Sequence, residues 1–381
     1  MKKIAFIIKL FQSNSFHGGG EKLFYNLINN FAEDGCLVDI YCSYSDVEQF
    51  AGINKITVID KVYKHTEPET MELFFDEVKK QVSNVGYDYI ISENITPPVD
   101  ITFLQGHSLI HRQRKLKNFF ESFLYNFRSV KKKRIKYQQK WMQEGYRKIF
   151  VVSNILKKDI MENFNIPEDK ICVVYPGVNI PDKEFSPIDI GNRQIVFGLS
   201  APGFKIKGGY ILLKALKILK DKGYNCKVRI IYPKFKKNLW IKFLVKVYGI
   251  KNYVEFLPLQ KNMESFYESI DCTVMPSIED TFGLVALEGM AYGKPSIAST
   301  NAGASEIIQE VQNGFIFEMN NFSSKNLAEK MMFFMDNKKH HEEYSGKSFE
   351  TAKFYSWHRT YKDLARDLFD LCLNIKRNPS T

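Results

Sequence analysis

The chain has 381 residues, of which 44% are hydrophobic and 25% charged, and its formal net charge is +11. This length accommodates two domains of about 100–200 residues each, and 31 Phe and 20 Tyr exclude a disordered protein, which lacks such aromatic content. The positive charge is concentrated in two blocks. Residues 111–148 hold 13 Lys and Arg against two Glu, and residues 203–251 hold 14 against Asp221 alone, so the remainder is acidic with a net charge of −13.

Several classes of protein are disfavoured by what the sequence lacks. No run of about 18 uncharged apolar residues is present, so we expect no transmembrane helix. The apolar run Ile4–Ile8 is too short for a signal peptide and predicts a first buried strand. The six Cys form no C-x-x-C pair and the seven His show no metal-ligand spacing, which indicates reduced thiols in a cytoplasmic protein and no metal site.

Short apolar runs alternate with longer helical patterns, which predicts parallel sheets covered by helices on both faces. In the first half we expect strands at 4–8, 37–41, 55–59, 87–92, 101–104, 148–152 and 171–174, and helices at 21–31, 68–82, 111–146 and 155–163. Residues 176–193, rich in Pro and Gly, predict the interdomain linker. Beyond them we expect strands at 195–199, 226–232, 253–257, 272–275 and 296–298, and helices at 207–221, 236–247, 263–269, from 283, and 357–375. The predicted fold is α/β, with two doubly wound domains facing a central cleft at the carboxyl ends of their sheets.

Two predicted loops open helices with features of anion-binding sites. Residues 18–21, Gly-Gly-Gly-Glu, follow the first strand, and the helix N-terminus there favours a phosphate. They lack the G-x-G-x-x-G spacing, which disfavours an NAD site and leaves a plain turn as the alternative. Residues 205–209, Lys-Ile-Lys-Gly-Gly, would neutralise a diphosphate with two ammonium groups, or would form a solvated basic loop.

A third segment, residues 276–295, places carboxylates at a strand end and inside an apolar helix. Glu279 and Asp280 end the strand, Gly283 permits close backbone approach, and Glu288 lies about one and a half turns into the helix. A buried carboxylate needs a partner. A ribose diol would supply two hydroxyl donors, and a salt bridge to a neighbouring Lys is the structural alternative.

This segment closely resembles the E-x-F-G-L-x-x-x-E-A-M-A-x-G-x-P signature of the retaining glycosyltransferases of family 4, group 1 glycosyltransferases with the GT-B fold. Other stretches resemble that family in the same order, namely 18–21, Val152-Ser153, 169–171, 176–179, 301–307, Asn313-Gly314 and 355–357. The resemblance implies an acceptor-binding Rossmann-like domain at 1–180 and a nucleotide-sugar-binding Rossmann-like domain at 181–355. Residues 356–381 would form a helix that crosses back onto the first domain.

The resemblance also assigns site residues. The implied catalytic residues are His107, Lys205, Lys207, Glu279 and Asp280, and the implied donor-binding residues are Gly18, Gly19, Gly20, Phe282, Gly283, Leu284 and Glu288. In this assignment Glu288 binds the ribose, the two lysines hold the diphosphate, and His107 lies beside the donor sugar. A loop histidine without that role is the alternative for His107.

The chain departs from the family pattern at three positions. Asp280 stands where the family has its first motif Glu, and the adjacent Glu279 would be able to substitute for it. The usual Arg after the first strand of the second domain is missing from Gly198-Leu199-Ser200, and we expect Lys205 to replace its charge as a point charge rather than a fork. Asn179 stands where the family has Asp.

The implied function is transfer of a sugar, with retention of configuration, from a nucleoside diphosphate sugar to a hydroxyl of a glycan or lipid-linked acceptor in bacterial-type surface polysaccharide assembly. A UDP-sugar is favoured over a GDP-sugar, and no further cofactor is expected. No D-x-D pair follows a strand, so we expect a metal-independent enzyme. The alternatives are a sugar-nucleotide epimerase of similar fold and a basic nucleic-acid-binding protein.

The first basic block has the composition of a membrane surface. Its cations include Arg112, Arg114, Lys131, Lys132, Lys133 and Arg134, interleaved with Phe119, Phe120, Phe123, Tyr125, Phe127 and Trp141. Such clusters suit an anionic bilayer, and the alternative is a core-packed helix whose cations face water. We therefore expect a cytoplasmic protein, peripheral at the inner face of the plasma membrane, with the second block serving as the diphosphate site plus a solvated lysine surface.

Overall fold

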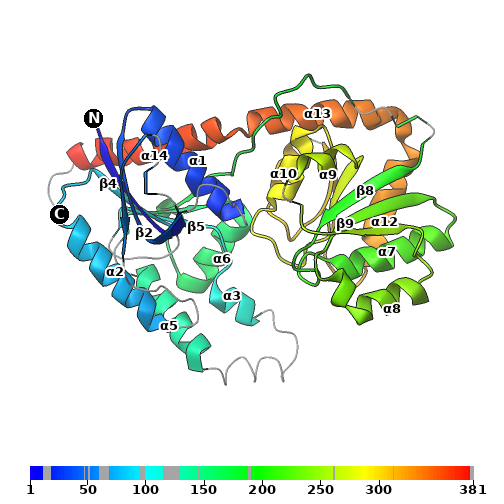
Figure 1. Ribbon diagram of the computed structural model, residues 1–381, viewed down its shortest axis with the longest axis horizontal. Coiled ribbons are helices and arrows are strands. Elements are labelled where there is room, and N and C mark those ends of the chain that lie inside the picture. Colours follow the sequence, from blue (N-terminus) through cyan, green and yellow to red (C-terminus); the bar gives the residue numbers. More distant parts are fainter. Residues whose placement is uncertain are drawn as a thin grey trace. The chain divides into compact units, whose positions relative to one another are not determined.

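The apolar runs of the sequence form two parallel sheets, each in its own unit of the chain (Figure 1). The computed structural model describes residues 1–11, 19–46, 48–49, 52–59, 68–93, 99–114, 129–143, 146–187, 190–191, 193–260, 262–311 and 313–377. Residues 1–175 together with 357–381 make up the first unit, and residues 176–356 make up the second unit. Val178 belongs to the second unit, where its backbone N–H donates to the carbonyl of Tyr355 at 2.9 Å.

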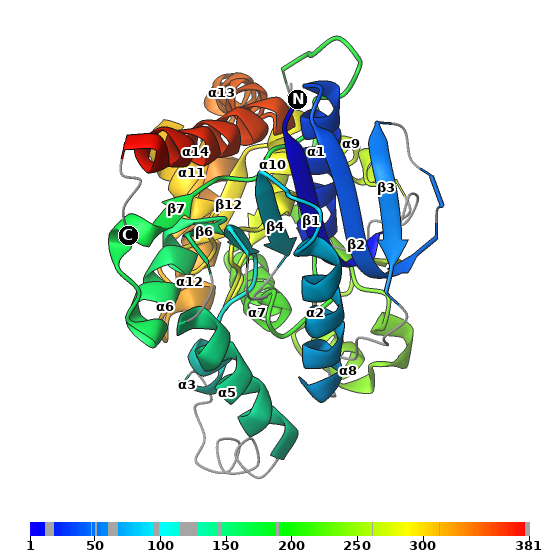
Figure 2. The ribbon, with the colours of Figure 1, turned by 90° about the vertical axis from the view of Figure 1, so that its left-hand side faces the viewer.

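The sheet of the first unit has seven parallel strands in the order β3-β2-β1-β4-β5-β6-β7 (Figure 2). They are β1 (Lys3–Phe11), β2 (Leu37–Ser45), β3 (Ile53–Val58), β4 (Tyr89–Glu93), β5 (Ile101–Leu104), β6 (Lys148–Val151) and β7 (Ile171–Val173). The helices are α1 (Gly19–Glu33), α2 (Pro68–Val82), α3 (Leu109–Arg114), α5 (Ser129–Gln143), α6 (Asn154–Phe164) and α14 (Trp357–Arg377), with the 3₁₀ turn η1 (Glu168–Lys170). Residues 4–8 of β1 are all buried, because a central parallel strand is covered on both faces.

The sheet of the second unit has six parallel strands in the order β10-β9-β8-β11-β12-β13. They are β8 (Ile195–Ser200), β9 (Cys226–Ile231), β10 (Val254–Leu257), β11 (Cys272–Met275), β12 (Ser296–Ser299) and β13 (Gly314–Phe317). The helices are α7 (Gly209–Asp221), α8 (Leu239–Val247), α9 (Glu264–Glu268), α10 (Leu284–Ala291), α11 (Ser305–Val311), α12 (Ser323–Asp336) and α13 (His341–Phe354), with η2 (Phe235–Lys237) and η3 (Lys338–His340). The strand order reverses between β1 and β4 in one sheet and between β8 and β11 in the other, so the prediction of two doubly wound α/β domains is confirmed.

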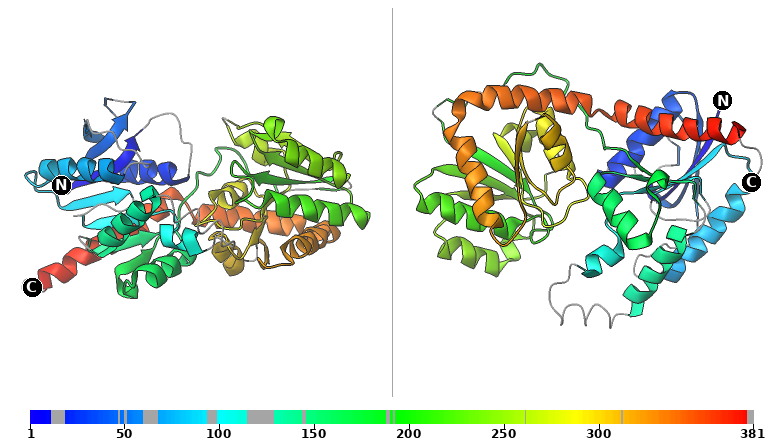
Figure 3. Two further views of the ribbon diagram at one scale, coloured as in Figure 1. Left: turned by 90° about the horizontal axis from the view of Figure 1, so that it is seen from below. Right: turned by 180° about the vertical axis from the view of Figure 1, so that it is seen from behind.

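The last helix is an integral part of the first unit. Figure 3 shows α14 running beside α1, and the two helices are in contact. The Tyr361 ring meets Phe31 edge-on at 4.8 Å between centroids, and its hydroxyl donates to Asp34. Leu364 and Leu368 of the same helix are fully buried. This packing closes the apolar face of α1 from water.

The region 111–146, expected as one long helix, contains α3 and α5, and residues 115–128 lie outside the described part of the chain. Trp141 on α5 is buried and meets Phe75 of α2 edge-on at 5.6 Å. Its expected role as a membrane-facing aromatic is therefore wrong, because it anchors α5 in the core. None of the described helices combines the length and apolar character needed to cross a bilayer, and the five cysteines with described side chains are free thiols.

We predict that Tyr361→Ala destabilises the first unit by about 3 kcal/mol, because it removes a buried ring and leaves a cavity between α1 and α14. Urea denaturation, with hydrogen exchange read on α1 peptides, measures the change. Tyr361→Phe keeps the ring and loses only the hydrogen bond to Asp34, and should cost about 1 kcal/mol. Phe354→Ala, at an exposed ring, is the control, and equal stability of Tyr361→Ala and the wild type would contradict the packing role of α14.

Candidate functional site

The reversal of strand order between β8 and β11 brings two predicted segments together in the second unit. Residues 201–208 follow β8 and residues 276–283 follow β11, and the strands are hydrogen-bonded neighbours. Loops on either side of such a switch point diverge onto opposite faces and leave room for a ligand. Here Lys207 Nζ lies 2.6 Å from Asp280 Oδ2, so two implied catalytic residues 73 positions apart form an ion pair.

A glycine begins the helix after each of these loops, and one of the two lets the loops approach each other. Gly208 and Gly283 cap the N-termini of α7 and α10 with φ of +74° and +96°, a region that favours glycine. A Cβ on Gly208 would lie 1.8 Å from the carbonyl oxygen of Pro276. The two loops are also tied directly, because the N–H of Ile278 donates to the carbonyl of Ile206 at 2.8 Å.

Asp280 is the fixed member of the ion pair. Its N–H donates to the carbonyl of Asn301 at 3.1 Å, and its own carbonyl accepts from the N–H of Gly303 at 3.1 Å. The Ser277 hydroxyl donates to Oδ2 at 3.4 Å. Lys207 reaches this carboxylate on a longer stem and is the more exposed partner, so an incoming anion would meet the ammonium group first.

The other implied residues of this loop pair divide by exposure. Lys205 is exposed and Glu279 is half-buried. The Phe282 side chain is buried, and its carbonyl accepts from Ala304 at 2.7 Å. Gly283 and Leu284 lie at the start of α10, where backbone N–H groups have no partner within the helix.

Glu288 has its partner from another helix. The hydroxyl of Tyr267, a buried residue of α9, donates to Glu288 Oε2 at 2.6 Å, and the Tyr292 ring stacks on Tyr267 at 5.4 Å. Burial, reinforced by the negative Glu288, raises the pKa of Tyr267 well above its usual value. This tyrosine partner was not among the partners expected for Glu288, because its position 21 residues away in sequence gave no signal.

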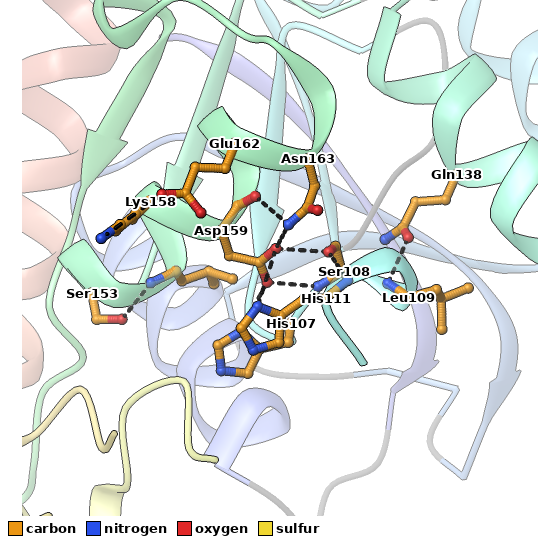
Figure 4. A network of polar contacts seen from close by, with 11 residues as sticks. His107, Ser108, Leu109, His111, Gln138, Ser153, Lys158, Asp159, Glu162 and Asn163 are labelled. Atoms are coloured by element: carbon orange, nitrogen blue, oxygen red, sulfur yellow. Dashed lines mark hydrogen bonds and ion pairs between the residues drawn. The ribbon is translucent and has the colours of Figure 1, made fainter. Parts of the chain in front are cut away.

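The implied catalytic histidine of the first unit lies in a dense polar network (Figure 4). His107 is buried, and its Nδ1 lies 2.8 Å from Asp159 Oδ2 on α6. Ser108 donates to the same carboxylate twice, through its backbone N–H at 2.9 Å and its hydroxyl at 2.7 Å, and Asn163 donates to Oδ1 at 2.7 Å. His107 thus lies in the loop between β5 and α3, and these hydrogen bonds hold its ring in place.

The charge of Asp159 determines the tautomer of His107. Burial raises the pKa of Asp159, but hydrogen bonds from His107 and Ser108 outweigh that effect and lower it to about 2. An ionised carboxylate only accepts hydrogen bonds, so Nδ1 of His107 carries the hydrogen in this contact and Nε2 points away from the carboxylate. This buried Nε2 has no hydrogen-bond partner among the described residues, which leaves it available to a polar ligand.

Ligand atoms of His107, His111 and Asp159 lie within 4.8 Å of one another, a spacing that also occurs at metal sites. The two imidazoles, however, stack at 4.3 Å between centroids with planes 7° apart. Lone pairs of parallel stacked rings run side by side and do not converge on one ion. The geometry therefore suits two imidazoles sharing one carboxylate better than a common metal ion.

A charged group at the switch point of the first sheet was missed by sequence reasoning. Lys9 lies near the end of β1, Glu93 ends β4 and Glu21 begins α1. Burial raises the pKa of Glu93, with the N–H of Lys9 opposing that rise, and burial also lowers the pKa of Lys9 against the attraction of both glutamates. Charged residues in apolar strand runs, Lys9 and Glu93, were the available signal.

The remaining predicted residues of the first unit lie at its helix ends. Gly19 and Gly20 begin α1, and Gly18 lies outside the described residues. The basic residues are distributed over two helices, with Arg112 and Arg114 on α3 and Lys131, Lys132, Lys133 and Arg134 on α5. Of these, Lys132 and Lys133 are exposed and Arg134 is half-buried.

Two protein families match this chain in consecutive segments. The family described as "Glycosyltransferase Family 4" matches residues 17–181, and "Glycosyl transferases group 1" matches residues 180–350. An uncharacterized glycosyltransferase of Methanocaldococcus jannaschii is 30% identical over 230 residues, which cover 59% of this chain and 60% of the relative. A D-inositol 3-phosphate glycosyltransferase of Streptomyces scabiei is 26% identical over 181 residues, 42% of this chain and 40% of the relative. The chain thus spans about half the length of these curated relatives.

Solved structures share the fold over almost the whole chain. WaaG, a glycosyltransferase involved in lipopolysaccharide biosynthesis, superposes with a TM-score of 0.75 at 15% identity, covering 96% of this chain and 99% of WaaG. Anabaena HepE in complex with UDP-glucose superposes with a TM-score of 0.70 at 16% identity, covering 97% and 100%. At these identities the superpositions establish the fold, and they confirm the predicted GT-B architecture.

We predict that Gly208→Ala destabilises the second unit by at least about 2 kcal/mol, because a left-handed residue is strained and the new Cβ meets backbone. Hydrogen exchange of peptides from α7 and β11 under urea measures the loss. Gly223→Ala is the matched control, since it has φ of +81° but open space around the new Cβ, and should cost about 1 kcal/mol. Equal effects of the two substitutions would contradict the close contact of the loops.

We predict that Asp159 stabilises the first unit in a pH-dependent way. Folding lowers its pKa from 3.8 to about 2, so the carboxylate contributes about 2 kcal/mol above pH 4, and this contribution is lost as pH falls through 2. The difference in Tm between wild type and Asp159→Asn should therefore be largest near neutral pH and shrink to roughly half by pH 3. Asp169→Asn, at an exposed position of η1, is the control, and a Tm difference independent of pH would refute the assignment.

Proposed function

The chain belongs to the group 1 glycosyltransferases, with the GT-B fold, and from that premise we propose that it transfers a sugar from a nucleoside diphosphate sugar to an acceptor hydroxyl. The observation that carries the proposal is the Lys207–Asp280 pair at the switch point of the second sheet. It places a cation where the carboxyl ends of parallel strands open to ligands, beside a helix that begins at a glycine.

In the proposed binding mode the second unit recognises the donor. Lys207, with Lys205, holds the diphosphate, and backbone N–H groups at Gly283 and Leu284 complete its hydrogen bonding. Glu288 accepts hydrogen bonds from the ribose hydroxyls, with Tyr267 fixing the orientation of its carboxylate. A UDP-sugar is our first choice of donor, supported by the UDP-glucose bound to the structurally similar HepE.

The proposed reaction retains the anomeric configuration. The acceptor oxygen bonds to the anomeric carbon on the face from which the diphosphate leaves, the bond between that carbon and the phosphate oxygen breaks, and the departing diphosphate takes the acceptor proton. The ammonium groups of Lys207 and Lys205 stabilise the charge on the leaving group. Because these cations supply the compensation, we propose that the reaction needs no divalent metal.

In the first unit we assign His107 to the transferred sugar, through its buried Nε2, in a ring that Asp159 orients. Lys9 and Glu93 offer charged partners for acceptor hydroxyls at the switch point of that sheet. The acceptor class we propose is a glycan or lipid-linked glycan of the cell surface. Its support is the fold shared with WaaG and the basic residues of α3 and α5, which suit an anionic membrane.

We predict that Lys207→Ala lowers turnover by about 10²–10³-fold, because one preorganised charge donor to a transition state is worth about 2.7–4 kcal/mol. The assay follows release of the nucleoside diphosphate, which must depend on acceptor. Lys214→Ala, an exposed lysine on α7, is the matched control. Wild-type turnover in Lys207→Ala would refute the role, and diphosphate release without acceptor would refute transfer.

The donor and the stereochemistry have their own measurements. A thermal-shift panel of UDP-, GDP- and ADP-sugars should show the largest rise in Tm for UDP-sugars, since a ligand stabilises the fold it binds. If the reaction retains the configuration, an α-linked donor gives an α-linked product, and NMR of the product determines this linkage. A β-linked product would overturn retention, and conversion of the donor into its epimer without transfer would favour the epimerase alternative.

A further inference from the structure

Helix α8 in the second unit has two apolar faces. On the inner face Ile241 and Val245 are buried in the core of the unit. On the outer face lie four large apolar side chains with exposed fractions of 77%, 58%, 51% and 58%, namely Leu239, Trp240, Phe243 and Val247. We call these four residues the α8 ridge. Such a group of exposed apolar side chains marks an interaction site more often than isolated exposed residues do.

The helical period explains how the two faces coexist. At 100° per residue the ridge occupies an arc of about 100°, and the core positions 241 and 245 lie on the far side of the helix. Lys242 and Lys246 occupy the arc beside the ridge. The helix itself is firmly built, because Asn238 accepts from the N–H of Ile241 at 3.1 Å as its N-cap. The ridge is therefore a stable surface of the fold.

The surroundings of the ridge are strongly positive. From Lys222 to Val254 the sequence has no Asp or Glu. Six lysines around α8 are exposed: Lys234, Lys236, Lys237, Lys242, Lys246 and Lys251. A surface of one sign of charge attracts a surface of the opposite sign within about a Debye length.

We propose that the α8 ridge docks the protein on an anionic lipid bilayer, with Trp240 and Phe243 in the interface and the surrounding lysines at the headgroups. Trp, Phe and Leu on one face beside Lys is the composition of interfacial helices, and lysine stems reach from apolar depth to the headgroups. Protein–protein interfaces are depleted of lysine, which makes a protein partner the poorer match. This inference goes beyond the proposed function and holds for any donor or acceptor.

Packed aromatic rings join the start of α8 to the loop that carries Lys207. Phe204, in the loop that carries Lys207, packs on Tyr232 at 4.9 Å between centroids. Phe235, in the turn that leads into α8, stacks on Phe256 at 3.7 Å, and Phe204 lies 6.4 Å from that ring. The site loops and the start of α8 follow carboxyl ends of the same parallel sheet. A docked α8 thus brings that edge of the second unit close to the headgroups.

Trp240 is a built-in probe for this inference. Trp141 and Trp357 are 5% and 7% exposed, whereas Trp240 is 58% exposed, and these are the three Trp of the chain. With vesicles of phosphatidylcholine containing about a third phosphatidylglycerol, the full chain should show a blue shift of tryptophan emission and quenching by brominated lipid. Vesicles of phosphatidylcholine alone should produce much less of both.

Substitutions at exposed positions separate the ridge from other surfaces. Two double variants test the ridge, Trp240→Ala/Phe243→Ala and Lys242→Glu/Lys246→Glu. Each should lower the partition coefficient onto anionic vesicles, measured by flotation, by at least about tenfold. The matched controls, at exposed positions elsewhere in the unit, are Phe322→Ala for the apolar pair and Lys338→Glu/Lys339→Glu for the charged pair. Both should float as the wild type does.

Three outcomes would overturn the proposal. The first is flotation of the protein without a change in Trp240 emission. The second is loss of flotation only in the α5 variant Lys132→Glu/Lys133→Glu. The third is self-association that buries Trp240 in the absence of vesicles, measured by sedimentation velocity. UDP-sugar binding by thermal shift is measured on every variant. Because α8 lies outside the proposed donor contacts, unchanged donor binding with lost flotation supports docking, and failure of donor binding in the wild type tests the proposed function alone.

Discussion

The ion pair between Lys207 and Asp280 depends on one constraint, the reversal of strand order in a parallel sheet. Because β8 and β11 are hydrogen-bonded parallel neighbours, the loops after them begin side by side at the carboxyl edge of the sheet, where the reversal of strand order leaves room for a ligand between them. Gly208 then becomes obligatory, since the backbone of Pro276 occupies the space that a side chain would need. The same candidate site includes Asp280, whose backbone is held by Asn301 and Gly303, and the start of α10.

The sequence was sufficient for the alternation of strands and helices, because each buried parallel strand is a short apolar run with a helical pattern after it. It was also sufficient for the loops at 205–209 and 276–283, whose glycines and charges stand at strand ends. The sequence did not predict which side chains from distant elements contact the site residues. Tyr267 reaches Glu288 and Asp159 reaches His107 from helices that only tertiary packing brings close. Trp141, read as an interfacial aromatic, is a core residue because α5 turns that face toward α2.

The two basic blocks illustrate the same limit. A count of charges located them, and aromatic residues stand beside cations in both blocks. Burial distinguishes the two cases, since Trp141 beside Lys140 packs inward whereas Trp240 beside Lys242 remains exposed. The second block, expected as the diphosphate site plus a solvated lysine surface, contains large exposed apolar side chains, among them the four of the α8 ridge. Which face of a helix is buried depends on the elements that pack against it in the tertiary structure, and a single sequence does not identify those elements.

The ion pair between Lys207 and Asp280 affects which ligands can bind at the candidate donor site, because a ligand must displace the carboxylate from the ammonium group. An anion that approaches the ammonium group competes with a carboxylate 2.6 Å away that is tethered to the same fold and therefore present at high effective concentration. A singly charged anion competes poorly with that carboxylate, whereas a diphosphate has two charges and several acceptor oxygens. In the proposed binding mode, Asp280 would therefore compete with other anions for the lysine and would favour ligands that carry several charges.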